Sequence, residues 1–333
     1  MLNSLTPRSK GSLLLELEDE ALFQVESAER RKRKSRLSGS AGFGQPAICG
    51  NELECPLPSR SIRNYLPERL ARAYEEHVLP DGRLYAWQAE AVCTPGVLQG
   101  RNLVYEAPTA GGKSLVAEVL MLRRVWQTGR PALLVLPYVS LCSEKSAYLG
   151  RILEAGGRVV QDFFGVGQGM PPLKDNTGVI VSTIEKANAF VNRLIQAGCL
   201  NLISAIVVDE LHMVGDLDRG YQLELLLTKL RHEAEIVGMS ATAPDVGRLA
   251  SWLRAALYRT DWRPVPLQHF TRNDIVLDAA GQPARPLPRV YTREQDPDGV
   301  LSLTAEATRK SLPVLIFCAT KRACESTASK VAE

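Results

Sequence analysis

The stretch Ala107-Pro-Thr-Ala-Gly-Gly-Lys-Ser114 decides the fold that we expect for this chain. It follows the apolar run 102–106, which we predict to be a strand, and it precedes a helical pattern that begins at Lys113. A glycine-rich segment between a strand and a helix is the context of a phosphate-binding loop, or P-loop. Gly111 and Gly112 allow the tight curvature that points successive backbone amides at phosphate oxygens, and the helix N-terminus adds partial positive charge.

The side chains of this loop have distinct expected roles. Lys113 is expected to contact the β- and γ-phosphates of a nucleotide, and the Ser114 hydroxyl to ligate Mg²⁺. Ala107 stands where the general pattern has its first glycine, and a glycine-rich helix start is the alternative interpretation of the loop taken alone. The predicted nucleotide site comprises Ala107, Pro108, Thr109, Ala110, Gly111, Gly112, Lys113 and Ser114.

Apolar runs alternate with amphipathic stretches on both sides of the loop. Strands are expected at 102–106, 132–137, 159–164, 179–183, 205–210 and 235–240, and helices at 113–125, 141–154, 185–197, 221–232 and 246–258. Such near-continuous Val, Ile and Leu strands favour a parallel sheet that is covered on both faces. The predicted fold class is therefore α/β, a doubly wound parallel sheet whose ligands lie beyond the carboxyl ends of its strands.

A pair of acids ends one of these strands. Ala205-Ile-Val-Val-Asp-Glu-Leu-His212 puts Asp209 and Glu210 at the edge of the sheet, where carboxylates are costly unless they meet a cation or water. We expect Asp209 to hold Mg²⁺, and Glu210 to orient and deprotonate an attacking water. A strand-to-loop transition with solvated acids is the alternative, which the upstream P-loop disfavours. Together the two segments predict nucleoside triphosphate hydrolysis.

The pattern changes after Tyr258. Proline-rich stretches at 261–267 and 281–288 interrupt the alternation, so we predict a linker over 259–312 that follows a first domain at 61–258. A new apolar run at 314–319 predicts a strand, and a helical pattern begins at Lys321. Residues 313–333 are therefore expected to begin a second, incomplete α/β domain.

Residues 1–60 differ in composition from the rest. They lack sustained periodicity and include the Gly/Ser stretch 37–44, so we expect a disordered basic tail with one short helix near 13–25. The block Arg30-Arg-Lys-Arg-Lys-Ser-Arg36 is typical of segments that bind importin or nucleic-acid phosphates. We expect a nuclear location through importin, with a solvated charge run as the alternative.

Composition limits the class of protein. The 333 residues are 45% hydrophobic and 23% charged, which excludes a collagen-like, mostly disordered or disulfide-stapled chain. The net charge is only +3, so a nucleic acid would have to meet a local basic groove. The seven cysteines include no Cys-x-x-Cys pair, which indicates neither a zinc site nor a disulfide framework. Apolar runs are far shorter than the ~18 residues of a membrane helix, so we expect no membrane contact, while the oligomeric state stays open.

Six motifs occur in order along the chain: Trp87-Gln88, the P-loop, Leu136-Pro-Tyr-Val139, Ser182-Thr-Ile-Glu-Lys186, Asp209-Glu-Leu-His212 and Ser240-Ala-Thr242. With them, the chain from about Leu66 to Glu333 resembles a superfamily 2 helicase of the DExH type. The segments at 192–195, 209–216, 219–229, 238–242 and 261–267 look like the DNA-repair helicases of the polymerase-theta and HELQ types. The resemblance implies RecA-like domains, ATP and Mg²⁺ as cofactors, single-stranded or partly unwound DNA as partner, and ATP hydrolysis coupled to unwinding.

The resemblance also implies roles for single residues. Gln88 would read the adenine edge, and Lys113, Asp209 and Glu210 would be catalytic. The motif of Ser240 and Thr242 would couple hydrolysis to strand movement. His212 would bridge the catalytic residues to this motif. The residues implied to hold DNA are Pro137, Tyr138, Ser182, Thr183, Lys186, Thr320 and Lys321. Taken alone, most of these positions would be read as strand ends, or as a helix cap such as Thr183.

Departures from the family pattern matter as well. Ser114 replaces the usual threonine, a mild change because Mg²⁺ needs only the hydroxyl, and Ala110 replaces a commoner serine. Nothing after Lys321 supplies the later motifs, whose arginines reach the γ-phosphate in the family and are worth on the order of 10³–10⁵ in rate. We therefore expect this chain by itself to bind ATP weakly and to hydrolyse or unwind little. The alternatives are a HELQ-type helicase, an RNA helicase of the same superfamily and a non-motor nucleic-acid-binding scaffold.

Overall fold

The computed structural model describes residues 58–165, 172–241, 245–267, 270–273, 275–277, 282–286, 290–292 and 294–332. Residues 1–57 of the tail predicted at 1–60, which include its expected short helix and the basic block Arg30–Arg36, lie outside these residues, and so does Thr242. The chain divides into two compact units, Met1–Pro264 and Val265–Glu333. Each unit is described by itself.

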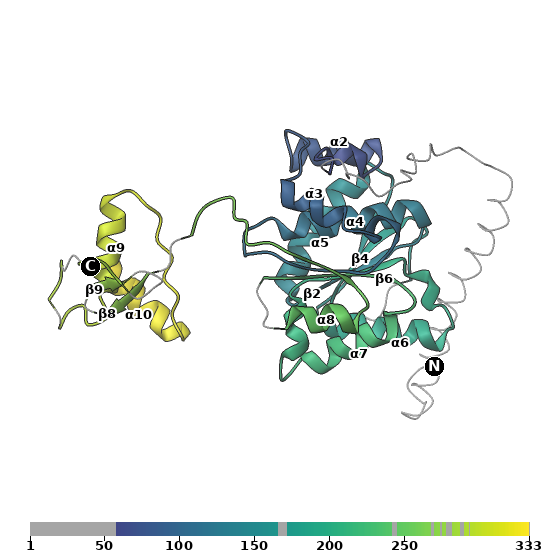
Figure 1. Cartoon of the computed structure of the whole chain (residues 1–333). Coiled ribbons are helices and arrows are strands. Elements are labelled where there is room, and N and C mark those ends of the chain that lie inside the picture. The colour runs from purple at the N-terminus through teal and green to yellow at the C-terminus, as the bar shows by residue number, and fades with distance from the viewer. Residues whose placement is uncertain are drawn as a thin grey trace, which may run out of the picture. The chain divides into compact units, whose positions relative to one another are not determined.

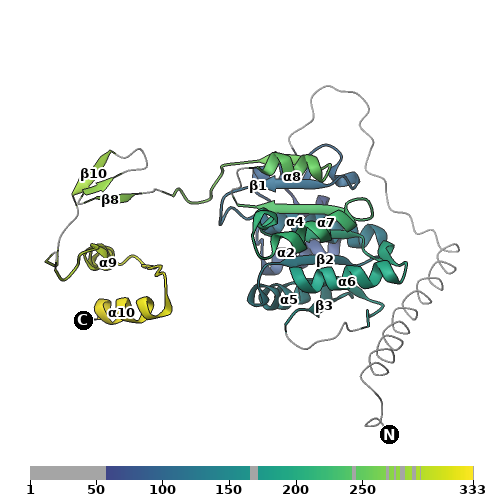
Figure 2. The same cartoon turned by 90° about the horizontal axis from the view of Figure 1, so that it is seen from below.

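The first unit is built on a seven-stranded parallel sheet. In the order β3-β4-β2-β5-β6-β1-β7, its strands are β3 (Val159–Phe163), β4 (Thr177–Thr183), β2 (Ala132–Leu136), β5 (Ala205–Val208), β6 (Glu235–Ser240), β1 (Leu103–Glu106) and β7 (Ala256–Arg259). Every neighbouring pair is parallel, and Figure 2 shows the strands edge to edge beneath the helices. The doubly wound parallel sheet predicted from the sequence is confirmed, together with all six of its expected strands.

Helices cover both faces of this sheet (Figure 1). One face carries α2 (Glu68–His77), α3 (Ala86–Val92), α4 (Lys113–Thr128) and α5 (Val139–Glu154), and the other carries α6 (Ile184–Gln196), α7 (Gly220–Leu230) and α8 (Val246–Trp252). Short 3-10 helices lie at Ile62–Asn64, Val97–Gln99, Leu200–Leu202 and Leu211–Gly215. Two separate cores result, because alternate residues of one strand face opposite layers: Leu103 and Tyr105 pack on one side of β1, and Val104 packs on the other.

The predicted helix at 246–258 is wrong beyond Trp252. Arg254 has a φ of 51°, which no helix continues, and Asn102 Nδ2 donates to the Leu253 carbonyl at 2.8 Å. The chain then returns along β1, and Ala256 N donates to the Asn102 carbonyl at 2.7 Å. Apolar residues in an edge strand have a spacing that a short helix also satisfies, so the pattern alone did not separate the two.

The second unit contains a small antiparallel sheet of β8 (Thr271–Asn273), β9 (Ile275–Leu277) and β10 (Pro283–Pro286), with α9 (Val300–Arg309) and α10 (Lys321–Ala332). These strands and α9 lie within 259–312, where we expected a linker. The predicted strand at 314–319 is wrong: among the described residues it has no strand to pair with, and Leu315 and Phe317 are 78% and 89% exposed. The helix from Lys321 is confirmed as α10.

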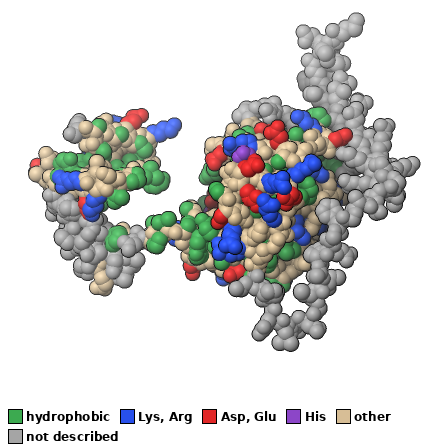
Figure 3. All heavy atoms as spheres, turned by 90° about the horizontal axis from the view of Figure 1, so that it is seen from above, with side chains coloured by type: hydrophobic (Ala, Val, Ile, Leu, Met, Phe, Trp, Pro, Cys, Tyr) green, Lys and Arg blue, Asp and Glu red, His purple; other side chains and the backbone are tan. Residues whose placement is uncertain are grey.

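The face of the first unit that carries α2 has charges of both signs. Figure 3 shows Lys and Arg side chains interspersed with Asp and Glu there. Arg63 pairs with Glu68 at 2.9 Å and with Glu75 at 2.5 Å, and Arg72 pairs with Glu68 at 2.9 Å. This face is therefore locally neutralised, which does not favour a polyanion. Within the described ranges, no helix is both long and apolar enough to cross a membrane.

Candidate active site

The loop between β1 and α4 lies at the carboxyl edge of the parallel sheet. Ala110 and Gly112 both adopt left-handed backbone, with φ of 61° and 88°. A Cβ on Gly111 would lie 2.9 Å from the Pro108 carbonyl oxygen, and one on Gly112 would lie 2.7 Å from Gln88 Nε2. Glycine is therefore favoured at both positions, and the loop has the tight curvature that a phosphate cradle needs.

The Lys113 side chain folds back over the loop. Its Nζ donates to the Ala107 carbonyl at 3.1 Å and to the Pro108 carbonyl at 3.2 Å. Burial lowers the pKa of the amine, while the charges of Glu210 and Asp209 oppose that shift. Neutral carbonyls stabilise an ammonium less than an anion does, so this arrangement fits a phosphate group that would replace them.

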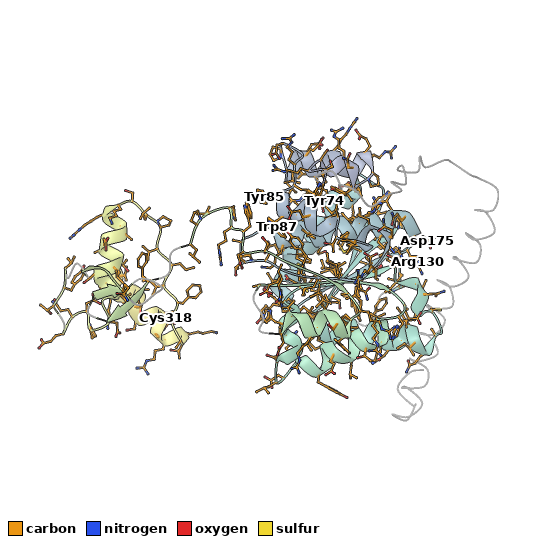
Figure 4. The ribbon with its side chains drawn as sticks, in the orientation of Figure 1. Tyr74, Tyr85, Trp87, Arg130, Asp175 and Cys318 are labelled. Carbon is orange, nitrogen blue, oxygen red and sulfur yellow. The ribbon has the colours of Figure 1, made fainter. Side chains whose placement is uncertain are left out.

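Gln88 joins α3 to the end of the loop. Its side chain is 2% exposed, its Oε1 accepts from Tyr85 N at 2.8 Å, and its Nε2 donates to the Gly112 carbonyl at 2.9 Å. An amide that makes these two bonds retains one further N–H and one lone pair. Tyr85 and Trp87 lie at one end of the sheet in Figure 4, and Arg130 and Asp175 lie at the opposite end.

The acids lie two strands away from the loop. The order of the sheet puts β6 between β1 and β5, so Ser240 at the end of β6 lies between Ala107 and Asp209. Ala107 N donates to the Ser240 carbonyl at 3.2 Å, so the start of the P-loop is hydrogen-bonded directly to β6. Burial, and next the charge of Glu210, raises the pKa of Asp209.

His212 connects the second acid to β6. Its Nδ1 lies 3.1 Å from Ser240 Oγ and 3.4 Å from Glu210 Oε2. Glu210 adopts a φ of 51°, and its buried Oε2 accepts no hydrogen bond within the described part of the chain. Through His212, the arrangement joins the Glu210 carboxylate to the end of a neighbouring strand.

The donor set of the site suits Mg²⁺. Ser114 supplies a hydroxyl and Asp209 a carboxylate, which are the hard oxygen ligands that this ion prefers. Among the residues that the structure describes, no group of three or more His, Cys, Asp or Glu could hold a metal ion. Few protein ligands are typical of Mg²⁺, because the ion keeps waters and substrate phosphates in its shell.

A second polar cluster follows β2. Tyr138 is 59% exposed, and the Arg219 guanidinium lies 6.0 Å from the centre of its ring. Arg219 Nη1 donates to the Pro137 carbonyl at 2.6 Å, and its Nε donates to Glu185 Oε1 at 2.6 Å. The structure thus brings together two loops that were predicted to bind DNA, through an arginine to which the sequence assigned no role.

The other predicted DNA contacts are placed differently. Ser182 and Thr183 are buried, and Ser182 Oγ donates to the Thr183 carbonyl at 3.0 Å. Lys186 Nζ lies 5.5 Å from the centre of the Phe163 ring. Thr320 and Lys321 are exposed residues of the second unit, where the Thr320 hydroxyl accepts from the amide of the third residue after it at 3.1 Å.

Two further residues, from the segment that follows β7, contact the P-loop and Tyr85. The Trp262 ring lies 4.4 Å from the Tyr85 ring, between centres, and Arg263 Nη1 donates to the Thr109 carbonyl at 3.1 Å. Sequence reasoning included both residues in the family resemblance but gave neither a role. Both residues contact partners that are more than 150 positions away along the chain. Arg263 and Thr109, for example, are 154 positions apart.

The chain is similar in sequence to known helicases. Residues 86–249 match the family model of DEAD/DEAH box helicases. DNA polymerase theta of Mus musculus is 40% identical over 80% of this chain, which covers 11% of that protein. Helicase POLQ-like of Caenorhabditis elegans is also 40% identical over 80% of the chain, which covers 30% of that protein. The chain thus spans less than a third of these two relatives.

Solved structures support the fold. The DUF1998 helicase MrfA bound to DNA superposes with a TM-score of 0.61 at 18% identity, over 83% of this chain and 39% of that one. The RecA-like fold expected from the sequence is confirmed. The chain therefore contains a DEAD/DEAH box helicase domain, similar over four fifths of its length to DNA polymerase theta and POLQ-like helicases.

Proposed function

We propose that this chain is the ATP-binding part of a DNA repair helicase of the polymerase-theta type, which hydrolyses ATP in response to DNA. The proposal rests on three segments at the carboxyl ends of adjacent strands. They are the P-loop after β1, Ser240 at the end of β6, and the acid pair Asp209 and Glu210 after β5. A phosphate cradle, a water activator and a connecting element are the parts that an ATP-driven motor requires.

Nucleotide binding follows from the P-loop. Its amides and the N-terminus of α4 would donate to phosphate oxygens, and Lys113 Nζ would exchange the carbonyls of Ala107 and Pro108 for phosphate. The spare N–H and lone pair of Gln88 suit the edge of an adenine. Ser114 and Asp209 would hold Mg²⁺, which when bound supplies positive charge that screens the phosphates.

Hydrolysis follows from the acids. Glu210 accepts a proton from a water molecule whose oxygen bonds to the γ-phosphorus, while the bond from that phosphorus to the bridging oxygen of ADP breaks. The products are ADP and inorganic phosphate, and the proton resides on Glu210 until it passes to solvent. The place of Glu210 directly after β5, next to Asp209, supports this role.

Coupling to DNA rests on two contacts. His212 joins Glu210 to Ser240, so a change at the acid reaches the end of β6. Tyr138, Arg219 and Lys186 present an aromatic ring and cations near the same edge of the sheet, which suits bases and phosphates of a single strand. We include Thr242 in this coupling on the resemblance alone.

Nuclear location is part of the proposal. The basic block Arg30–Arg36 and the similarity to a repair polymerase support import by importin. A fluorescent fusion of the full chain tests this: an R30–R36 alanine variant is expected to leave the nucleus, and unchanged nuclear signal in that variant would exclude the block as an import signal.

Steady-state ATP hydrolysis with single-stranded DNA or RNA of equal length tests the function. By itself the chain is expected to hydrolyse ATP slowly. DNA stimulation of this slow rate that Lys113→Ala abolishes supports the proposal, and equal stimulation by RNA indicates an RNA helicase instead. Strand binding without nucleotide binding indicates a non-motor scaffold. The chain is 40% identical to both relatives, so a POLQ-like repair helicase is the second candidate within the same class.

A further inference from the structure

Two cations hold three consecutive carbonyl groups of the P-loop. Lys113 Nζ donates to the carbonyls of Ala107 and Pro108 at 3.1 and 3.2 Å, and Arg263 Nη1 donates to that of Thr109 at 3.1 Å. Lys113 makes these contacts from the helix that follows the loop, and Arg263 makes its contact from the segment that follows β7. The same short piece of backbone therefore contacts two cations.

The segment that carries Arg263 is fixed against the site. At its start, Arg259 pairs with Glu106 at 3.2 Å, and Thr260 N donates to the Glu106 carbonyl at 3.0 Å. The Trp262 ring then packs on Tyr85. These contacts order the backbone before Arg263, so the arginine is brought to the loop by the fold rather than by its own hydrogen bond alone.

The backbone of this segment also lies over the loop. A Cβ on Gly111 would lie 3.6 Å from the Trp262 carbonyl oxygen. Arg263 itself is half-buried and belongs to the first unit, which ends at the next residue. A guanidinium at this position is close to the phosphate cradle, and its planar set of donors matches phosphate oxygens.

We propose that Arg263 is a second phosphate-binding cation of the nucleotide site, which exchanges the Thr109 carbonyl for an oxygen of the bound triphosphate as Lys113 exchanges its own carbonyls. This inference rests on the proposed nucleotide function and adds to it a residue that neither the motifs nor the comparisons assign. The competing explanation is that Arg263 only fastens the linker segment to the loop through Thr109.

The effect of removing the positive charge of Arg263 distinguishes the two explanations. Arg263→Lys keeps the positive charge and a donor, whereas Arg263→Gln keeps a donor amide without the charge. A phosphate-binding role predicts that Arg263→Gln weakens binding of the triphosphate analogue AMP-PNP about tenfold, with Arg263→Lys within about threefold of wild type. Adenosine, which has no phosphate, is expected to bind all three proteins equally.

The experiment is a calorimetric titration of the full chain with AMP-PNP and Mg²⁺, with adenosine in parallel. Arg248→Gln is the matched control, since Arg248 lies on α8 and pairs with Asp245 at 3.8 Å. Thermal melts of each variant show whether it is folded. Unchanged AMP-PNP affinity in Arg263→Gln overturns the inference, and so does an equal loss in both Arg263 variants.

The outcomes distinguish this inference from the proposed function. Wild type that binds AMP-PNP, with binding lost in Lys113→Ala but kept in Arg263→Gln, overturns the role of Arg263 and leaves the nucleotide site intact. Wild type that does not bind AMP-PNP overturns both.

Discussion

His212 Nδ1 and Ser240 Oγ lie 3.1 Å apart, which joins the loop after β5 to the end of β6. Because β6 also contacts the P-loop through the bond from Ala107 N to the Ser240 carbonyl, the nucleotide cradle and the acids meet at one residue. Ser240 is fully buried, so solvent does not compete for its hydroxyl. We therefore expect a shift of either partner to reach the other through this contact.

Ser240→Ala tests this contact. Removal of the hydroxyl is expected to leave nucleotide affinity within about threefold of wild type and to reduce the stimulation of ATP hydrolysis by DNA about tenfold, since only the link between sites is lost. Hydrolysis rates at saturating ATP, with and without single-stranded DNA, measure the effect. Ser251→Ala, in which the exposed α8 hydroxyl that donates to Gly247 is removed, is the control. Full DNA stimulation in Ser240→Ala would remove this contact from the account.

Lys113→Ala is expected to lower ATP affinity about 100-fold, because a charge-assisted contact to phosphate is lost and no other group replaces it. The loop itself has to survive the substitution, which circular dichroism and melting temperature check. Lys174→Ala, at an exposed position before β4, is expected to bind ATP as wild type does. Equal ATP titrations of Lys113→Ala and wild type would refute the nucleotide site.

Gly112→Ala and Gly157→Ala form a matched pair. Both glycines have positive φ, 88° and 71°, but a Cβ on Gly157 meets nothing within 4 Å, whereas one on Gly112 meets Gln88 Nε2 at 2.7 Å. The backbone term alone is expected to cost about 1–2 kcal/mol in each variant. Gly112→Ala is expected to lose about 1 kcal/mol more, with the bond from Gln88 to the Gly112 carbonyl. Denaturant melts measure both, and equal losses would contradict the close approach of Gln88.

Glu235 makes stability depend on pH. It is 6% exposed at the start of β6, and burial raises its pKa to about 7 although Arg124 lies 3.3 Å away. A carboxyl whose pKa is higher in the folded than in the unfolded state stabilises the fold below the unfolded pKa, and that stability is lost as the pH rises through the folded pKa.

The free energy of unfolding is therefore expected to fall by about 3 kcal/mol between pH 4.5 and pH 7 from this group. Glu235→Gln should remove that part of the slope, because an amide does not titrate. Urea melts across this range measure it. A wild-type slope that persists in Glu235→Gln would show that other groups cause the pH dependence.

Tyr138→Ala is expected to weaken binding of single-stranded DNA about tenfold, because stacking on an exposed ring is worth roughly 1–3 kcal/mol per base. Fluorescence anisotropy with a labelled oligonucleotide measures the affinity. Tyr221→Ala, which removes an exposed ring at the start of α7, is the control. Similar effects in both variants would exclude a specific role for Tyr138.

The sequence predicted the parallel sheet and the P-loop because both depend on local patterns. Strands buried on both faces are continuous apolar runs, and the loop is recognisable from its glycines and its position after a strand. The helix that was expected to continue to Tyr258 shows the limit, since four residues of an edge strand, Ala256–Arg259, have no periodicity that excludes a helix. The run at 314–319 shows a second limit of sequence-based prediction, because an apolar run forms a strand only when a neighbouring strand pairs with it.

Parts of the site were not predictable in the same way. Arg219 and Arg263 bond to backbone carbonyls of Pro137 and Thr109 that lie 82 and 154 positions away. An arginine carries no local signal for a partner at such a separation. Gln88 was assigned to adenine, and its additional bond to the Gly112 carbonyl depends on how α3 packs on α4 rather than on a motif.

In the proposed mechanism, Glu210 activates the water that hydrolyses ATP bound at the P-loop. Single-turnover release of phosphate from γ-labelled ATP, compared in wild type and Glu210→Gln, tests it most directly. Glu210→Gln is expected to bind ATP with near wild-type affinity. It is expected to release phosphate on the order of 10²–10⁴ times more slowly than wild type, because it has no general base. Equal rates of phosphate release in the two proteins would contradict it.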